Sequence, residues 1–371
     1  MSDPTLQAWG LLRSALEEPL ALPGWPVADL DLVLRLLRRA RLLGRVGWRL
    51  REAGRLDELP QSARDQFSSA LAMVQARERL ARWELDRLAV PLAHPSVGRV
   101  VLLKGCAYLL SSLPNCRGRL FADVDLLVAE TRLDAAEARL RSHGWAGKPL
   151  TPYDDRYYRR WTHELPPMVH AEREVEVDLH HDLVMRTARL KTRVGLLLDA
   201  ARPLPDTPYH VPDPVDLVLH AMTHLLYGGE MDDALRELVD VDQLLRHFAE
   251  AELGFWDRFW PRAEAIGLAP PAFLGLRYAA RLLSTPVPPA VVDASRSAAP
   301  PGPWLRALDR LVPLALFPGH PDRPSARLPA ARLLLYMRAH WLRMPPVLLA
   351  RHLGYKAWLR LRPDVPGNPG A

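Results

Sequence analysis

The chain has 371 residues, of which 49% are hydrophobic and 25% charged, and its formal net charge is +6. This length is enough for two or three domains, and the composition is typical of globular proteins, which excludes a disordered or fibrous chain. Nearly all basic residues are arginine, as is typical of a GC-rich bacterial genome. The only lysines are Lys104, Lys148, Lys191 and Lys356.

Cysteines and apolar runs limit the classes of protein further. Cys106 and Cys116 are too few to hold zinc by themselves, and their spacing permits a disulfide, although nothing else indicates a secreted framework. The amino terminus lacks the basic segment and following apolar segment of a signal peptide. No run approaches the ~18 apolar residues of a membrane span. We therefore expect a cytoplasmic protein.

Residues 1–95 are predicted to be helical. An apolar segment at 30–42 is interspersed with arginines, and from Pro60 onward apolar residues such as Phe67, Leu71 and Leu85 recur at helical spacing. This pattern favours packing over a ligand-binding role.

Residues 96–210 alternate between strands and helices. Strands are predicted at 97–103, 124–128, 163–169 and 174–180, and helices at 106–113 and from Thr131 to near Gly144. Asp134, three residues after Thr131, is typical of a helix start. This alternation is typical of a small α/β unit.

From residue 211 to 371 the chain is again predicted to be helical. Helices are predicted at 216–227, 234–248, 256–266 and 272–283, while frequent prolines between 286 and 329 predict short helices and many loops. Residues 331–363 contain no Asp or Glu, and their basic residues are Arg332, Arg338, Arg343, Arg351, Lys356, Arg360 and Arg362. With Trp341, Tyr355 and Trp358 among them, these residues could bind RNA or anionic lipid. A packed helix pair with solvated arginines is the interpretation we favour.

Two carboxylates stand at the head of the apolar run 123–128. Side chains alternate faces along a strand, so Asp123 and Asp125 project together while Val124 faces the packing. Two such close carboxylates repel each other unless a positive charge lies between them, which Mg²⁺ usually provides. A solvated strand start is the alternative interpretation.

A third carboxylate, Asp178, lies between the apolar residues Val177 and Leu179. An aspartate pair with a third acid on an adjacent strand suits two-metal phosphoryl chemistry, in which ions lie roughly 3.5–4 Å apart. An ordinary half-exposed strand shows the same alternation of charged and apolar residues. The prediction of a metal site therefore rests on the ordered combination of the three acids.

The ordered set of motifs resembles a known family. Val101-Leu102-Leu103-Lys104-Gly105, Arg119, the run 123–128 and Val177-Asp178-Leu179-His180 resemble the bacterial nucleotidyltransferases of the DNA polymerase beta superfamily, in the subgroup with Leu-Lys-Gly and Asp-x-Asp motifs. The resemblance covers about residues 95–250. It implies an α+β fold, in which a small mixed-sheet nucleotidyltransferase core at 96–210 is flanked by helical regions at 1–95 and 211–371.

The resemblance also implies roles for individual residues. Asp123, Asp125 and Asp178 would be catalytic and bind two Mg²⁺ ions, and Asp178 would help to deprotonate the acceptor. Lys104, Gly105 and Arg119 would bind the nucleotide. His180 would orient Asp178 or contact substrate, with a packing role as the alternative, and His224, Arg236 and Asp240 would be substrate-facing. Cys106 departs from the small hydroxyl residue that follows the glycine in the wider superfamily.

The helical histidines and charges have other interpretations. His220 and His224 have the i, i+4 spacing of a zinc pair, but Ala221 replaces the glutamate of metalloproteases, which favours a core or substrate-facing role. Arg236 and Asp240, four residues apart, could form an ordinary helix-surface pair.

The predicted function is metal-dependent transfer of an NMP from an NTP, such as ATP, to a hydroxyl of a small-molecule or peptide-like acceptor, with release of pyrophosphate. The alternatives are a non-catalytic binding or regulatory protein of the same fold, or an RNA-directed transferase that uses the basic residues 331–363. Binding of nucleic acid is the less favoured of these interpretations.

Overall fold

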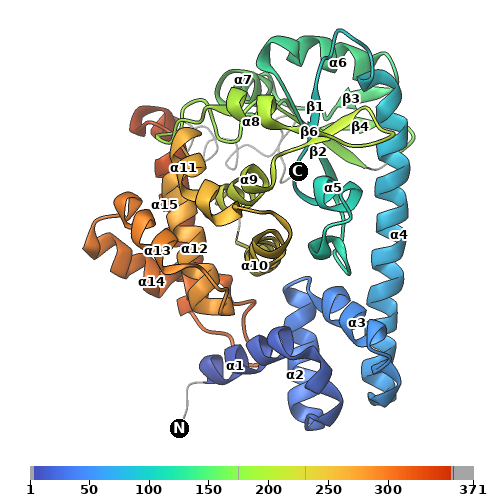
Figure 1. Cartoon of the computed structure of the whole chain (residues 1–371), viewed down its shortest axis with the longest axis vertical. Helices are drawn as coiled ribbons and strands as arrows, with labels where there is room; N and C mark the ends of the chain where they lie inside the picture. Colours follow the sequence, from blue (N-terminus) through green and yellow to red (C-terminus); the bar gives the residue numbers. More distant parts are fainter. Residues whose placement is uncertain (1–3, 174, 230, 352–353, 355–371) are drawn as a thin grey trace.

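A computed structural model of the chain describes residues 4–173, 175–229, 231–351 and 354. Within these residues one large hydrophobic core cluster extends from the N-terminal helices through the sheet to the C-terminal helices. Figure 1 shows the sheet at one end of the molecule, with the long helix α4 (Gln61–Leu92) running along its side. The fold is α+β, as predicted.

The N-terminal helices agree with the predicted pattern. The helices before the sheet are α1 (Pro4–Glu17), α2 (Val27–Arg39), α3 (Leu43–Glu52) and α4, with 3₁₀ turns at Pro19–Gly24 and Leu56–Glu58. Phe67, Leu71 and Leu85 of α4 are buried, as their helical spacing indicates. Helix α4 reaches from α3 to the sheet, where it contacts strand β2 and helix α6. It therefore connects the N-terminal helices to the strand that carries two of the acids.

Seven strands in the described residues form one mixed sheet in the order β3-β4-β5-β2-β1-β7-β6. They are β1 (Val100–Leu102), β2 (Asp123–Val128), β3 (Trp145–Gly147), β4 (Met168–His170), β5 (Glu176–His180), β6 (Arg202–Pro203) and β7 (Tyr209–Val211). Strand β2 pairs parallel with β5 and antiparallel with β1, while β1 pairs parallel with β7. Strand β2 therefore lies in the middle of the sheet, where its apolar residues are completely buried.

Helices lie between and after these strands. Those within the sheet region are α5 (Lys104–Leu110), α6 (Leu133–Arg141), α7 (Pro152–Trp161) and α8 (Val194–Ala200), with 3₁₀ turns at Pro114–Cys116 and Glu130–Arg132. The later helices are α9 (Pro214–Tyr227), α10 (Ala234–Ala251), α11 (Phe255–Ala265), α12 (Ala269–Leu283), α13 (Pro289–Ser295), α14 (Gly302–Leu316) and α15 (Arg327–Arg343), with a 3₁₀ turn at Arg296–Ala298. Helices α9 and α10 were predicted to within a few residues.

Three local predictions are corrected. Thr131 does not cap α6, because it lies in a 3₁₀ turn and α6 has no side-chain cap. The strand predicted at 163–169 is reduced to β4 and an isolated bridge between Glu164 and His180. Helix α14, predicted to be short, has 15 residues and contains Pro313 in its last turn.

Helix α7 was not predicted, although its start carries a recognisable signal. Thr151 accepts a hydrogen bond from the backbone N–H of Asp154, and its hydroxyl donates to the Asp154 carboxylate. Pro152 occupies the first helical position. A capping threonine followed by proline and by an acidic residue three positions after the cap is a helix-start pattern.

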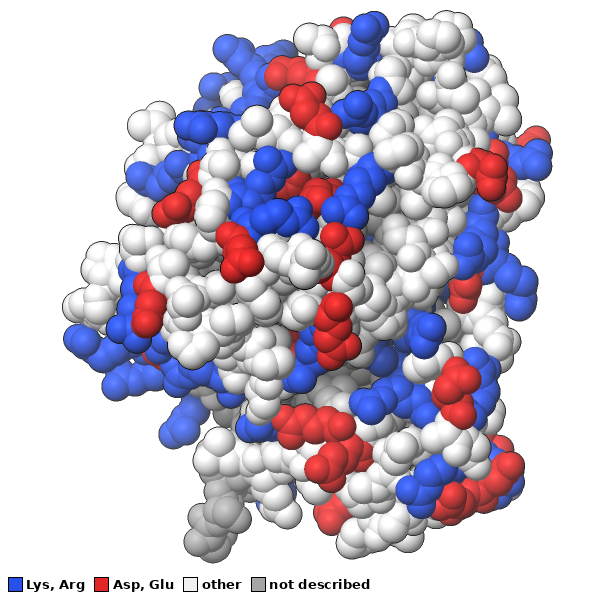
Figure 2. All heavy atoms as spheres, in the orientation of Figure 1, with Lys and Arg blue, Asp and Glu red and all other residues white. Residues whose placement is uncertain are grey.

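The basic stretch 331–363, for which a packed helix pair was favoured over an RNA or lipid surface, begins within α15. Lys356, Arg360, Arg362, Tyr355 and Trp358 lie outside the described residues. Arg332 pairs with Asp232, and Arg338 donates to the Leu226 carbonyl of α9. Figure 2 shows acidic and basic side chains interspersed over the face in view. The contacts of Arg332 and Arg338 agree with the packed-helix interpretation.

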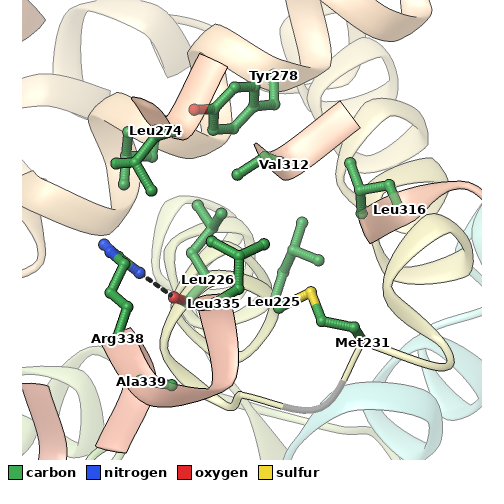
Figure 3. A pocket seen from close by; sticks show the side chains of 11 residues that line it. Leu225, Leu226, Met231, Leu274, Tyr278, Val312, Leu316, Leu335, Arg338 and Ala339 are labelled. Carbon is green, nitrogen blue, oxygen red and sulfur yellow. Dashed lines mark hydrogen bonds between the residues drawn. The ribbon is translucent and has the colours of Figure 1, made fainter. Parts of the chain in front are cut away.

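The C-terminal helices enclose a small apolar cavity, which Figure 3 shows from close by. Its lining residues are Leu225, Leu226, Met231, Leu274, Tyr278, Leu308, Val312, Leu316, Leu335, Arg338 and Ala339. None of the predicted metal ligands lines it. No helix among the described residues is long and apolar enough to cross a membrane.

Candidate functional site

Strands β2 and β5 bring the three predicted acids together. The parallel register pairs Asp125 with Asp178 and Asp123 with Glu176. Carboxylate oxygens of Asp123, Asp125 and Asp178 lie within 4.8 Å of one another. Asp125 is only 2% exposed, whereas Asp178 is half-buried and Asp123 is exposed. The alternation of side chains along a strand thus produces the acid site from residues 55 positions apart in the chain.

Lys104 introduces a positive charge into this acid site. Its Nζ donates to Asp125 Oδ1 at 2.6 Å. Burial alone lowers the pKa of Lys104, but the surrounding carboxylates, Asp125 first, outweigh this effect and raise it. Burial alone raises the pKa of Asp125, but Lys104 and then His180 hold that pKa well below its usual value. Lys104, predicted to pair with phosphate oxygens, therefore neutralises part of the acid site.

The remaining carboxylate atoms suit a cation. Asp178 Oδ1 is buried and has no hydrogen-bond partner among the described residues. Burial, followed by the negative charges of Asp125 and Glu164, raises the pKa of Asp178. Lys104 and His180 both contact Oδ1 of Asp125, and neither of these contacts involves Oδ2. An all-oxygen set with an unsatisfied carboxylate oxygen fits a hard divalent cation such as Mg²⁺.

Gly105 is adjacent to Lys104 and lies against Arg119. A Cβ at Gly105 would lie 2.5 Å from Arg119 Nη1 and 3.2 Å from the Phe121 ring. The Arg119 guanidinium also lies over the rings of Tyr108 and Phe121. Close approach of the guanidinium therefore requires glycine at position 105.

Arg119 is held by a buried ionic network that joins distant helices. Arg119 Nε donates to Asp240 Oδ2 at 3.1 Å, and Arg45 Nη2 of helix α3 donates to Asp240 Oδ1 at 2.7 Å. Arg236, four residues from Asp240, pairs with Asp233 at 2.8 Å. The surface pair suggested by the spacing of Arg236 and Asp240 is thus corrected, because Asp240 points into the core.

His180 contacts Asp125 rather than Asp178. Its Nε2 lies 3.1 Å from Asp125 Oδ1, and its Nδ1 lies 3.5 Å from Glu164 Oε2. Sequence reasoning did not include Glu164 or His163 among the site residues. In the sequence, only the adjacency of His163 and Glu164 indicated a possible ligand pair. The bridge that places this pair beside β5 is a tertiary contact, which local sequence does not reveal.

His220 and His224 of α9 have different surroundings. His224 Nδ1 lies 3.0 Å from Glu237 Oε1 of α10. His220 is buried, and burial followed by the charge of Lys104 lowers its pKa well below the usual value. Neither histidine belongs to a group with metal-ligating geometry in the described part of the chain.

The two cysteines are free, so the disulfide that their spacing permits is absent. Cys106 is buried in α5, and its Sγ lies 3.6 Å from the Asp123 carbonyl oxygen. Burial, followed by the negative charges of Asp125 and Asp123, raises the pKa of the Cys106 thiol. A raised pKa disfavours the thiolate, the form in which cysteine acts as a nucleophile.

A family model described as an uncharacterised nucleotidyltransferase matches residues 26–284. The chain belongs to this family. Comparison with curated proteins and with solved structures gave no match. The nucleotidyltransferase match includes Lys104, all three acids and Asp240, and it ends before the basic stretch 331–363. The acid site therefore lies within the matched part of the chain.

Proposed function

We propose that the protein is a metal-dependent nucleotidyltransferase that transfers an NMP from an NTP to a hydroxyl of a small-molecule or peptide-like acceptor. The observation that carries this proposal is the convergence of Asp123, Asp125 and Asp178 from two adjacent parallel strands. Family membership supports the same class of reaction. We also infer that the protein belongs to the Leu-Lys-Gly subgroup of the polymerase beta superfamily.

In the proposed reaction the acceptor oxygen attacks the α-phosphorus, the bond to the bridging oxygen breaks, and pyrophosphate leaves. Bound Mg²⁺ ions, held by the three acids, supply charge neutralisation for the phosphates. Asp178 accepts the hydroxyl proton as the general base. Lys104 would donate to phosphate oxygens if a bound cation neutralised Asp125 in its place.

The most direct test is pyrophosphate release from each of the four NTPs, with the label on the α-phosphate and Mg²⁺ present. Nucleotidyl transfer predicts pyrophosphate and a labelled NMP adduct or, without acceptor, slow release of NMP. Release of inorganic phosphate from the γ-position would contradict the proposal, because attack at that atom is a different reaction. The non-catalytic alternative predicts NTP binding without either product.

Replacement of Lys104 should separate nucleotide binding from metal binding. We expect Lys104→Ala to weaken binding of a non-hydrolysable NTP by about tenfold, because a charge-assisted hydrogen bond to phosphate is lost. Binding of Mn²⁺ alone should be retained or strengthened, because the ammonium that competes for Asp125 is gone. Calorimetric titrations measure both affinities, and Lys191→Ala, an exposed lysine, is the control. Unchanged nucleotide affinity would remove Lys104 from the nucleotide site.

A further inference from the structure

A second group of ligand-type side chains lies directly beside the acid site. His163, Glu164 and His180 each offer one ligand atom, and these atoms lie within 4.8 Å of one another. Glu164 Oε2 lies 3.5 Å from His180 Nδ1 and 3.9 Å from His163 Nε2. Both distances are too long for a good hydrogen bond. They approach the separation of about 3.3–3.6 Å between ligand atoms of a tetrahedral zinc ion with bonds of about 2.0–2.2 Å.

The backbone fixes this group in place. Glu164 and His180 form a β-bridge, and Leu165 N–H donates to the Leu179 carbonyl at 2.9 Å. His181 N–H donates to the His163 carbonyl at 2.8 Å. The segment that carries His163 and Glu164 is therefore joined to the end of β5, and the three side chains need no rearrangement of secondary structure to meet.

Ring nitrogens of His163 and His180 are also available to bind a ligand. His163 Nδ1 is buried and has no hydrogen-bond partner among the described residues. Leaving a buried polar group unpaired destabilises a fold, and a bound ligand can relieve that cost. Nε2 of His180 lies 3.1 Å from Asp125 Oδ1, so in the neutral ring that donates to this carboxylate the lone pair on Nδ1 faces Glu164. A histidine that donates its second nitrogen to a carboxylate is the usual arrangement around protein-bound metals.

We propose that His163, Glu164 and His180 bind a zinc ion, distinct from the hard cation of the acid site. Two imidazoles and one carboxylate form the ligand set of a zinc site that keeps its fourth position open. The His163 and Glu164 side chains are 25% and 23% exposed, so solvent or a ligand reaches that position. The ion fixes the His180 ring and thereby positions Asp125, which links zinc occupancy to the acid site.

The test measures zinc and cobalt binding by the full chain and requires no nucleotide. Protein purified without a polyhistidine tag should retain about one zinc per chain, and Co²⁺ should replace it with visible ligand-field bands. We expect Glu164→Gln and His163→Ala to weaken affinity by about 100-fold or more in chelator competition. Glu164→Gln preserves side-chain volume, and circular dichroism confirms that each variant is folded.

Two further variants decide where the ion binds. His94→Ala removes an exposed histidine and should leave zinc affinity within about twofold. Asp123→Asn removes an acid-site ligand and should weaken zinc affinity far less than Glu164→Gln does. Loss of zinc in Asp123→Asn with retention in Glu164→Gln would assign the ion to the acid site and overturn the proposal. Equal affinity in every variant, or no zinc binding by the wild-type chain, would overturn it as well. Zinc binding that persists without nucleotidyl transfer would leave this proposal intact.

Discussion

Asparagine at Asp123 or at Asp178 is expected to reduce metal-dependent pyrophosphate release by about 10³-fold or more. Each substitution keeps the shape of the side chain but removes one of the three negative charges that hold the cations in the proposed site. At Asp178 it also removes the proposed proton acceptor. The loss should reduce kcat more than it raises KM, because the proposed phosphate contacts of Lys104 are unchanged in both variants.

The measurement is single-turnover release of pyrophosphate at saturating NTP and Mg²⁺, together with the thermal unfolding midpoint of each variant. Asp134→Asn is the matched control, because Asp134 is exposed in the first turn of α6 and lies outside the acid site. The control should retain wild-type turnover. Full activity in purified, folded Asp123→Asn would refute the assignment of the metal ligands, even if the protein proved to be a transferase.

Asparagine at Asp240 is expected to lower the free energy of unfolding by about 3–5 kcal/mol. The Asp240 carboxylate is the shared partner of Arg45 and Arg119, and all three side chains are less than one-tenth exposed. Removing one charge leaves two buried guanidinium groups without compensation, which is far more costly than loss of a surface pair. Urea denaturation followed by circular dichroism measures the change.

The control for this change is Asp31→Asn, in an exposed pair with Arg35 on helix α2, where the expected loss of unfolding free energy is below about 1 kcal/mol.

The pH dependence of the unfolding free energy gives a second measurement. Burial alone raises the pKa of Asp240, but Arg45 and Arg119 lower it below its ordinary value. The stabilisation is thus present above the unfolded-state pKa and is lost as pH falls through the folded-state pKa. The difference between wild type and Asp240→Asn should shrink in acid, and a difference independent of pH would contradict the ionic explanation.

Local pattern was sufficient for much of the fold. The alternation in 123–128 predicted β2 and the common face of its two aspartates, because the period of a strand follows directly from backbone geometry. Helices α4, α9 and α10 followed from their apolar spacing for the same reason. Proline density misled the prediction at α14, since Pro313 lies in the last turn of a helix whose apolar face packs on its neighbours. Tertiary burial overrode local propensity there.

The local sequence pattern did not predict which side chains surround each acid. Spacing indicated that Lys104 precedes a glycine turn, but only the pairing of β1 with β2 places its ammonium on Asp125. Arg236 and Asp240 have the spacing of a surface pair, yet Asp240 accepts a hydrogen bond from Arg45, which lies 195 residues earlier in the chain. Such contacts depend on which elements pack together, and a single sequence contains no direct record of that.

The sequence by itself determined the three acids, their order and the strands that carry them, because side-chain alternation is a local property of the backbone. Only the tertiary structure decided what surrounds them: the ammonium of Lys104, the imidazole of His180, and the His163-Glu164 pair beside it. The physical reason is distance along the chain. Charges and ligands separated by tens of residues become neighbours only when strands pair, and that pairing sets the pKa of each carboxyl and the shape of both proposed metal sites.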